Sequence, residues 1–523
     1  MTLLFITIIV ALVLIGSPLF LIVGSATALS FFLFLPDHQT LLELLPVVQK
    51  MEDLITKQEF LAVPLFMMSG AIMTQGGIAR RLVRVAMAAF GWMPGGLAVS
   101  AVVACMFFAA ISGSSPVTLI AVGSIVLPAM TNAKYPENFS LGLITTAGSL
   151  GCLVPPSISM LIYAISTTGS VASVSPEDLF LAGLIPAAFV GGLLCIYSIW
   201  VGLTMTADRQ SFNGQELRTS LVDGFWALLL PVIVLGGIYG GLYTPSEAGA
   251  PAAIYALFVT KFIYRELDFP KLRATLIDTA ALMGSLLPII ALAFGLNEFL
   301  ALIGIHDLLM QWIRDMNLGP FGFLLLVNVV LIVIGALMDS ISCTLIFAPM
   351  LAPIAYQLYG IDPVHFGIVF VVNMEIGYLM PPVATNLFVS AAVFRKPFGQ
   401  VVRAVLPTLG ITCGALVVMM YVPTISKAAL NWKRGVAIYE PFPWDGRPVG
   451  LTTDAPVTPD ASGATPDPTN GAPGSGAANI NDLMNKAMAD FDEESEVAPS
   501  AAPSGTPTIN DLMKKSLGTL DED

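Results

Sequence analysis

The sequence Ile111-Ser112-Gly113-Ser114-Ser115-Pro116 interrupts an apolar region with hydroxyl side chains, a glycine and a proline. The apolar runs on either side, residues 97–111 and 117–130, are both shorter than the roughly 20 residues that a membrane-spanning helix needs. Because lipid does not tolerate unpaired backbone groups, a break at membrane depth must be buried in protein or line a cavity. The stretch is therefore predicted to be the tip of a hairpin inside the membrane. A surface loop between two full spans is the alternative.

A second stretch, Leu337-Met338-Asp339-Ser340-Ile341-Ser342, has the same polar character and favours the hairpin interpretation. An offset of 226 residues places Asp339 opposite Gly113 and Ser340 opposite Ser114. The same offset aligns Pro94 with Pro320, Thr118-Leu119-Ile120 with Thr344-Leu345-Ile346, Gly151 with Gly377, and Pro155-Pro156 with Pro381-Pro382. The chain thus reads as two halves, each with a hairpin followed by a helix that is interrupted at Pro-Pro, as in transporters built from internal repeats.

The composition is that of a multi-pass membrane protein. The chain has 523 residues, of which 56% are hydrophobic and 11% are charged. The net charge of −13 says little about a substrate, because 15 of the 36 acidic residues lie in residues 440–523. With three histidines and no metal-ligand, phosphate-loop or Ser-His-Asp pattern, the sequence does not suggest an enzyme.

The predicted spans indicate how the two halves are oriented. Five spans are expected between the hairpins, at about 139–168, 179–203, 224–241, 248–263 and 275–297, and an odd number makes the repeat inverted. Basic residues near span ends place one face in the cytoplasm; they are Arg80, Arg81, Arg84, Lys134, Arg209, Arg218, Lys261, Arg265, Lys271, Arg273, Arg395, Lys396 and Arg403. The count puts the end of the last span, 402–425, in the periplasm, whereas Lys427, Lys433 and Arg434 favour the opposite side.

Oxygen-rich residues at the breaks are candidates for binding a hard cation such as Na⁺. The candidate cation ligands are Ser112, Gly113, Ser149, Gly151, Asp339, Ser340, Thr344, Glu375 and Gly377. The alternative for Asp339 is a helix cap in a water-filled loop. Glu375, whose repeat partner is Ser149, is either a proton or cation site or a hydrogen-bonded packing residue.

The interrupted helices are expected to complete each site. Prolines 155, 156, 381 and 382 remove amide donors and free backbone carbonyls, and the half-helices that follow point their N-termini toward an anionic substrate. The candidate substrate-binding residues are Ser114, Ser115, Ser157, Thr385 and Asn386. A plain proline kink is the alternative. Two further helix starts are predicted at Thr244-Pro245-Ser246-Glu247, a capping box, and at Ser175-Pro176-Glu177-Asp178.

Taken together, these motifs resemble the large membrane subunit of the tripartite ATP-independent periplasmic (TRAP) transporters, the DctM-like permeases, over about residues 1–430. The resemblance rests on AVPLF at 62–66, GGIARRL at 76–82, PGG at 94–96, SGS at 112–114, PPS at 155–157, YGG at 239–241, TPSEA at 244–248, Met338-Asp339, GIDPVHFG at 360–367, PPV at 381–383 and NLF at 386–388. Three features depart from it: Pro116-Val117-Thr118, Glu375 and the acidic tail.

The resemblance implies an all-α polytopic inverted-repeat transporter of the elevator type, with two re-entrant hairpins and two interrupted helices. It implies import of an organic acid, a carboxylate, across a bacterial inner membrane, coupled to a Na⁺ gradient. It also implies two partners, a small four-helix membrane subunit and a periplasmic substrate-binding protein. A stand-alone Na⁺-coupled divalent-anion symporter and a membrane scaffold that recruits partners through its tail are the alternatives.

The predicted organisation divides the chain into six parts. Residues 1–93 are scaffold spans and an amphipathic arm, 94–168 the first hairpin and interrupted helix, and 169–319 scaffold spans and a second arm. Residues 320–394 are the second hairpin and interrupted helix, 395–430 the last span, and 431–523 a disordered acidic tail. The tail repeats Ile-Asn-Asp-Leu-Met at 480–484 and 509–513. The repeat is either a short duplicated segment of nascent helix in a disordered tail or a pair of linear binding motifs.

Overall fold

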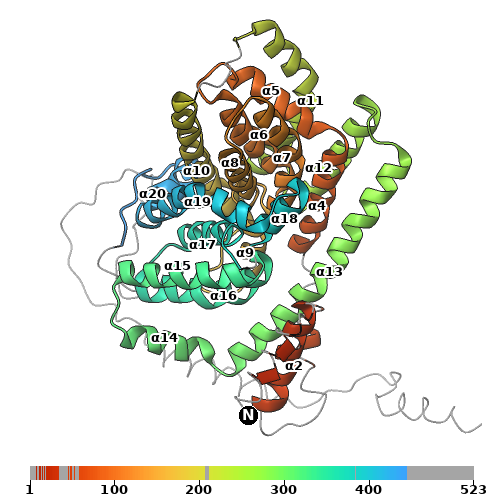
Figure 1. Cartoon of the computed structure of the whole chain (residues 1–523). Coiled ribbons are helices and arrows are strands. Elements are labelled where there is room, and N and C mark those ends of the chain that lie inside the picture. The colour runs from red at the N-terminus through yellow and green to blue at the C-terminus, as the bar shows by residue number, and fades with distance from the viewer. Residues whose placement is uncertain are drawn as a thin grey trace, which may run out of the picture. The chain divides into compact units, whose positions relative to one another are not determined.

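The computed structural model describes residues 19–34, 58–205, 211–382 and 384–443, with isolated positions before residue 58. These residues form helices and, within the described part, no β-strand (Figure 1). The repeated Ile-Asn-Asp-Leu-Met motif lies outside the described residues. In chain order the helices are α2 (Leu19–Phe34), α4 (Gln58–Gln75), α5 (Ile78–Phe90), α6 (Gly96–Ser112), α7 (Ser115–Asn132), α8 (Glu137–Ser149), η2 (Leu150–Cys152), α9 (Ile158–Thr167), α10 (Pro176–Thr204), α11 (Gly214–Tyr239), α12 (Pro245–Phe258), η3 (Val259–Ile263), α13 (Phe269–Leu302), α14 (Ile305–Asp315), α15 (Pro320–Leu337), α16 (Ser340–Tyr359), α17 (Pro363–Gly377), α18 (Thr385–Phe394), α19 (Phe398–Tyr421) and α20 (Pro423–Arg434).

Seven of the described helices are long and apolar enough to cross a membrane: α7, α10, α11, α13, α15, α16 and α19. The pair α4–α5, which bends by 71°, makes an eighth if it is counted as one span. The chain is therefore an all-α, multi-pass membrane protein, as the composition predicts. Several apolar helices are shorter, among them α6, α9, α17 and α18, and these are the ones that adjoin the predicted breaks.

Both halves contain the same series of elements. An amphipathic helix, α5 or α14, begins after a glycine in the left-handed conformation, Gly77 or Gly304. A helix pair follows, α6–α7 in the first half and α15–α16 in the second, and then an interrupted helix, α8–η2–α9 or α17–α18. The predicted capping box at Thr244 and Glu247 is present, and Ser175 caps α10 by accepting the Asp178 N–H.

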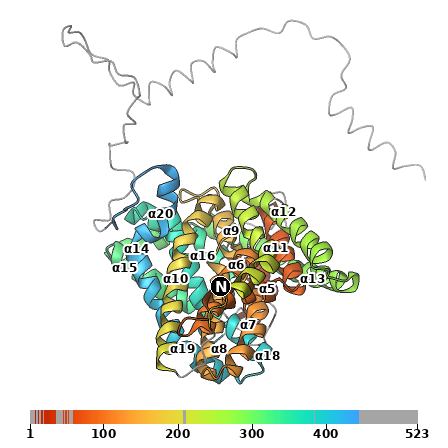
Figure 2. The same cartoon turned by 90° about the horizontal axis from the view of Figure 1, so that it is seen from above.

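The halves are interleaved rather than stacked end to end. The outgoing helix of the first pair, α7, packs against α18 of the second half, and α16 of the second pair packs against α9 of the first half. Both views show α7 and α18 side by side (Figures 1 and 2). This reciprocal arrangement joins both helix pairs and both interrupted helices into one packed unit.

Ion pairs form at the two ends of this unit, and they include two of the three basic residues that follow the last predicted span, Lys427 and Arg434. Lys427 Nζ lies 2.7 Å from Asp362 Oδ2 and 2.7 Å from Glu440 Oε1, and Arg434 contacts Asp178 at 2.7 Å. These cations are neutralised by acidic partners, so they are poor markers of a cytoplasmic face. Lys396 pairs with Glu137 at the other end of the unit, which places the starts of α8 and α19 together, as the span count predicts.

The last predicted span is two helices. Pro423 lies in the first turn of α20, so α19 ends at Tyr421 and the amphipathic α20 begins. A proline inside a continuing helix would lack its amide donor and would clash with the preceding turn. Residues up to 430 were predicted to belong to the last span and residues from 431 to the tail, so a separate helix from Pro423 to Arg434 was not predicted.

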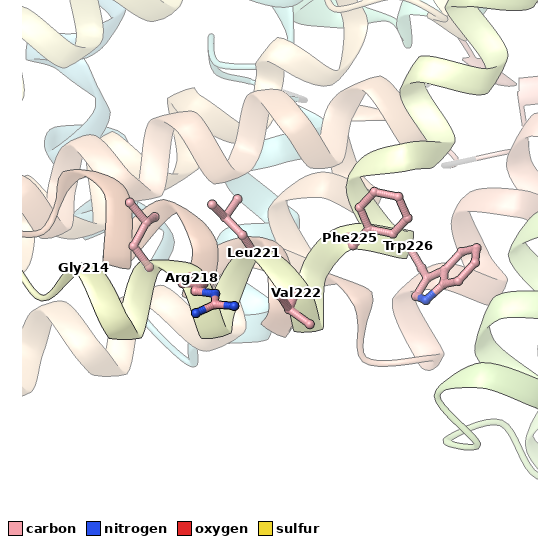
Figure 3. A pocket seen from close by; sticks show the side chains of 7 residues that line it. Gly214, Arg218, Leu221, Val222, Phe225 and Trp226 are labelled. Atoms are coloured by element: carbon pink, nitrogen blue, oxygen red, sulfur yellow. The ribbon is translucent and has the colours of Figure 1, made fainter.

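Helix α11 presents an apolar face that no other described element covers. Leu221, Val222, Phe225 and Trp226 are all exposed and follow one turn after Arg218. Together with Gly214 and Leu217 these residues line an open groove of about 530 Å³ (Figure 3). Such a face is suited to the hydrocarbon of a bilayer or to a membrane partner.

Candidate functional site

The first predicted tip is a closed ring of hydrogen bonds. Helix α6 ends at Ser112, Gly113 adopts the left-handed conformation with φ of 60°, and α7 begins at Ser115, so the break is shorter than predicted. The Ser112 and Thr118 hydroxyls are 2.8 Å apart, and Thr118 Oγ1 donates to the Ser114 carbonyl at 2.8 Å. The hydroxyl hydrogens of Ser112 and Thr118 are thus used within the tip itself.

The interrupted helix of the first half closes over this tip. The Ile158 N–H donates to the Gly113 carbonyl at 3.1 Å, and Ser157 caps α9 while its hydroxyl donates to the Cys152 carbonyl. A Cβ on Gly151 would lie 2.7 Å from the Ser114 carbonyl oxygen, so only glycine permits this approach. Residues 151–160, including both prolines, are buried.

The second predicted tip is capped by a carboxylate instead of a glycine. Asp339 Oδ2 accepts the Ser342 N–H at 3.1 Å and so caps α16, which begins at Ser340. Thr344 Oγ1 donates to the Ser340 carbonyl at 2.7 Å. Asp339 Oδ1 and Ser342 Oγ are buried and have no hydrogen-bond partner among the described residues. Asp339 is therefore a helix cap with one oxygen left over.

The second break is more open than the first. Helix α17 ends at Gly377, where a Cβ would lie 2.9 Å from the Gly335 backbone of α15. Pro381 and Pro382 are exposed, in contrast to their buried counterparts in the first half. Helix α18 starts after Ala384, which is in the left-handed region with φ of 32°, and no side chain caps its N-terminus.

Two side-chain contacts join the halves at the breaks. Ser149 Oγ lies 2.9 Å from Glu375 Oε1, and Asn386 Nδ2 donates to Ser115 Oγ at 2.5 Å. Ser149, Ser115, Glu375 and Asn386 are all buried. The structure thus brings together predicted residues that lie more than 200 positions apart in the chain.

Thr385 is half-buried and makes no side-chain hydrogen bond among the described residues. Thr118, in contrast, takes part in the first tip and was not predicted as a site residue, whereas Ser342 was expected among the oxygen groups around Asp339. The available signal for Thr118 was its alignment with Thr344 at the repeat offset of 226. Sequence also gave no sign of the buried amide pair Asn328 and Asn373, which joins α15 to α17.

Unpartnered oxygens are concentrated in the second half. Among the described residues, the buried side-chain oxygens without a partner in residues 339–386 are Asp339 Oδ1, Ser342 Oγ, Asn373 Oδ1, Glu375 Oε2 and Asn386 Oδ1. A buried oxygen without a donor costs free energy unless a ligand, ion or water satisfies it. These five oxygens are therefore candidates for contact with a ligand, an ion or water.

A polar cleft of about 580 Å³ lies apart from these breaks. It is bounded by the α9–α10 connection, α13, α14 and α16, and its polar lining includes Asn297, Glu298, His306 and Asp307. None of the predicted site residues lines this cleft.

Comparison with known proteins identifies the family. A family model described as "Tripartite ATP-independent periplasmic transporter, DctM component" matches residues 6–425. The chain belongs to the DctM family. This DctM-family chain is 42% identical over 410 residues to the C4-dicarboxylate TRAP transporter large permease protein DctM of Pseudomonas aeruginosa, covering 78% of the chain and 93% of that protein.

The DctM-family chain is also similar to one further relative in sequence and to one solved structure in fold. It is 35% identical to the isethionate TRAP transporter permease protein DctMQ of Oleidesulfovibrio alaskensis, over 70% of the chain and 57% of that protein. Its fold is similar to the crystal structure of the YdaH transporter of Alcanivorax borkumensis, with a TM-score of 0.56 and 15% identity, covering 84% of the chain and 99% of that structure. At this identity the likeness concerns the fold alone. The chain is thus a large permease subunit of a TRAP transporter, not an enzyme.

Proposed function

We propose that this permease subunit imports a carboxylate substrate by coupling its movement to an inward Na⁺ gradient. The observation that carries the proposal is the set of unpartnered oxygens around the second break, which begins with Asp339 Oδ1 and Ser342 Oγ. Na⁺ is a hard cation that prefers oxygen ligands, and a carboxylate oxygen beside a hydroxyl is such a set. The P. aeruginosa relative is named for C4-dicarboxylates, which supports a carboxylate as the cargo.

The proposed cation sites differ between the halves. At the second break, Asp339, Ser340, Thr344, Gly377 and Glu375 supply carboxylate, hydroxyl and carbonyl oxygens. At the first break, the candidate ligands are carbonyl oxygens near Gly113 and Gly151 and the hydroxyl of Ser149, with no carboxylate in the tip itself. The Ser112 hydroxyl is already hydrogen-bonded within the tip, so it is not proposed as a ligand.

The proposed substrate site lies between the two breaks. Ser115 and Asn386 touch each other, and Asn386 Oδ1 has no partner among the described residues. No side chain caps the N-terminus of α18 next to Thr385, and the Asn386 and Leu387 N–H groups donate to the Tyr378 and Ala384 carbonyls. The partial positive dipole at this helix N-terminus favours an anion such as a carboxylate. Ser114 and Ser157 border the same region through the first tip.

We infer an elevator-type movement in which the two helix pairs and the two interrupted helices travel as one body. The reciprocal packing of α7 with α18 and of α16 with α9 supports this, since neither pair can move without the other half. The remaining spans would serve as the scaffold. Two partners are proposed, a small four-helix membrane subunit and a periplasmic binding protein that selects the cargo, with the assembly in a bacterial inner membrane. The name DctMQ of one relative supports a second membrane component.

The test is uptake of radiolabelled succinate into liposomes that contain the permease and its small subunit. We expect accumulation only when the binding protein and an inward Na⁺ gradient are both present. Uptake that is unchanged in K⁺ buffer would overturn Na⁺ coupling. Uptake without any binding protein would favour a stand-alone divalent-anion symporter instead.

A further inference from the structure

Helix α16 contains a proline that leaves one of its backbone carbonyls without the usual donor. In an α-helix the Leu345 carbonyl would accept the N–H of residue 349, but Pro349 has no N–H. Leu345 is 1% exposed, so water has little access to its carbonyl oxygen. A buried carbonyl without a donor costs free energy, so another group has to supply a hydrogen.

The missing hydrogen comes from a different helix. Asn297 of α13 donates from Nδ2 to the Leu345 carbonyl oxygen at 2.6 Å. A carbonyl can only accept, so the nitrogen of the Asn297 amide, and not its oxygen, must face it. Asn297 Oδ1 is buried and has no partner among the described residues. In the described part of the chain, the bond to Leu345 is therefore what fixes the orientation of this amide.

The first half lacks both members of this pair. The repeat offset of 226 places Pro349 opposite Gly123 and Asn297 opposite Ala71. In α7 the N–H of Gly123 is available for the Leu119 carbonyl, and Ala71 has no side chain that can form a hydrogen bond. The proline and the asparagine thus occur together in the half where the bond is made, and the shared backbone plan requires neither of them.

The bond joins two parts of the molecule that the proposed elevator movement separates. Helix α13 is one of the scaffold spans, and it packs against α16 of the moving unit. Asn297, Pro349 and Pro353 line the polar cleft of about 580 Å³ between α13, α14 and α16. The corresponding space in the first half, between α4, α5 and α7, is about 190 Å³. Scaffold and moving unit are therefore fitted less closely beside the second arm, and Asn297 connects them across this boundary.

We propose that Asn297 is a positioning residue that holds the moving unit to the scaffold in the present state. The inference rests on the elevator movement proposed above. When α16 moves along α13, the Asn297–Leu345 bond breaks, and Pro349 offers no N–H to replace it. The present state is thus favoured by one buried hydrogen bond, which for a bond of ordinary strength is about 5-fold in population.

Melting temperatures test the chemistry of the bond without reference to transport. Asn297→Leu removes the donor at similar volume and should lower the melting temperature. Pro349→Ala restores an N–H inside α16, so most of the loss caused by Asn297→Leu should disappear in the Pro349→Ala protein. Ser285→Ala, which removes an exposed hydroxyl that bonds within α13, is the matched control and should have little effect. If Pro349→Ala does not reduce the loss, Asn297 does not act by satisfying the Leu345 carbonyl.

Distance measurements by electron spin resonance test whether the bond favours the present state. Spin labels at Leu242→Cys, in the exposed α11–α12 connection of the scaffold, and at Gln357→Cys on α16 report the position of the moving unit. Proteins with one of these two substitutions show any labelling of the five native cysteines. The sample is the permease with its small subunit.

We expect two distance populations, one of which matches the separation in the present structure. Asn297→Leu should shift the ratio about 5-fold away from that population. The double variant Asn297→Leu with Pro349→Ala should keep this shift, because α16 then satisfies its own carbonyl in both states. Ser285→Ala should leave the ratio unchanged.

Two outcomes distinguish the role of Asn297 from the movement itself. If the wild-type protein shows both populations and Asn297→Leu leaves their ratio unchanged, the proposal is overturned and Asn297 has a structural role alone. If every protein, the wild type included, shows one population with and without Na⁺ and succinate, the elevator movement is overturned together with the role of Asn297 in it. The melting temperatures still decide which group satisfies the Leu345 carbonyl.

Discussion

The first and second breaks have the same backbone plan and opposite chemistry. At the first, neutral hydroxyls and carbonyls satisfy one another around Gly113, and Pro155 and Pro156 are buried. At the second, Asp339 caps a helix with one oxygen, its other oxygen has no partner among the described residues, and Pro381 and Pro382 are exposed. A duplicated scaffold can thus hold one tip that is closed by its own groups and another in which buried oxygens are left without a partner in the described part of the chain.

The largest effect is expected at the carboxylate of the second tip. Asp339→Asn keeps a good helix cap but removes the charge, so the fold should survive while uptake falls about 100-fold, equivalent to about 2.7 kcal/mol. The stabilisation of the purified protein by Na⁺, measured as the rise in its melting temperature, should disappear. If the variant keeps both its uptake and its Na⁺ response, the second break is not a cation site and the contrast between the breaks is structural only.

A smaller effect is expected from a methyl group at the first break. Gly151→Ala places a Cβ 2.7–2.8 Å from the backbone of Ser114 and Ser115, and this overpacking should cost about 1–3 kcal/mol. Thermal unfolding in detergent measures it. Gly192→Ala on α10, where a Cβ meets no atom within 4 Å, is the control and should be neutral or stabilising. Equal melting temperatures for Gly151→Ala and the control would show that the first break is not closely packed.

A somewhat smaller effect on stability is expected outside both breaks, at Lys427 beyond the last span. Burial lowers the pKa of Lys427, but the Asp362 and Glu440 carboxylates outweigh it, so the net pKa is raised. The contribution of the ion pairs is therefore fully present below the ordinary lysine value of 10.5 and is lost as the pH rises through the folded value. Lys427→Met should lower stability by about 1–2 kcal/mol at neutral pH and remove this alkaline loss.

Melting temperatures between pH 7 and pH 11 test the Lys427 prediction. Lys433→Met is the control, since the contact of Lys433 within the described part of the chain is a distant one with the Tyr239 ring, 5.7 Å from its centroid. A wild-type and Lys427→Met pair whose difference does not shrink at high pH would contradict the assignment of the stabilisation to these ion pairs.

The smallest effects on stability are expected from removing one hydroxyl in each tip, and these two variants test the difference between the tips most directly. Ser112→Ala breaks a hydroxyl ring and should destabilise the protein by about 1 kcal/mol whether or not Na⁺ is present. Ser342→Ala removes a hydroxyl oxygen without a partner among the described residues, so it should leave Na⁺-free stability unchanged and weaken only the Na⁺ response. Melting curves of both variants with and without Na⁺ test this. If both variants show the same change in melting temperature with and without Na⁺, the first tip is not closed and the second open in the sense proposed.

Much of the local structure was predictable because it depends on short-range rules. The capping box at Thr244 and Glu247, the start of α10 after Ser175, and the amphipathic arm from Ile78 to Phe90 all form where the pattern places them. Both tips are shorter than predicted, because Pro116 and Ser340 suit the first turn of the helices that follow. Helix α20 was not predicted as a separate helix, because most of its residues were assigned to the last span, which in the structure ends before Pro423.

The sequence by itself determined that the chain is an all-α membrane protein with two related halves, since composition, hydropathy and the 226-residue register are properties of the chain alone. Only the tertiary structure decided which oxygens are satisfied. From the sequence, Asp339 could be either a helix cap or a cation ligand. In the structure one of its oxygens caps α16, and the other has no hydrogen-bond partner among the described residues. Ser149 and Glu375 were readable as repeat partners, and folding places them in contact. Hydrogen-bond satisfaction depends on groups that folding brings together from distant positions, and no local pattern encodes that proximity.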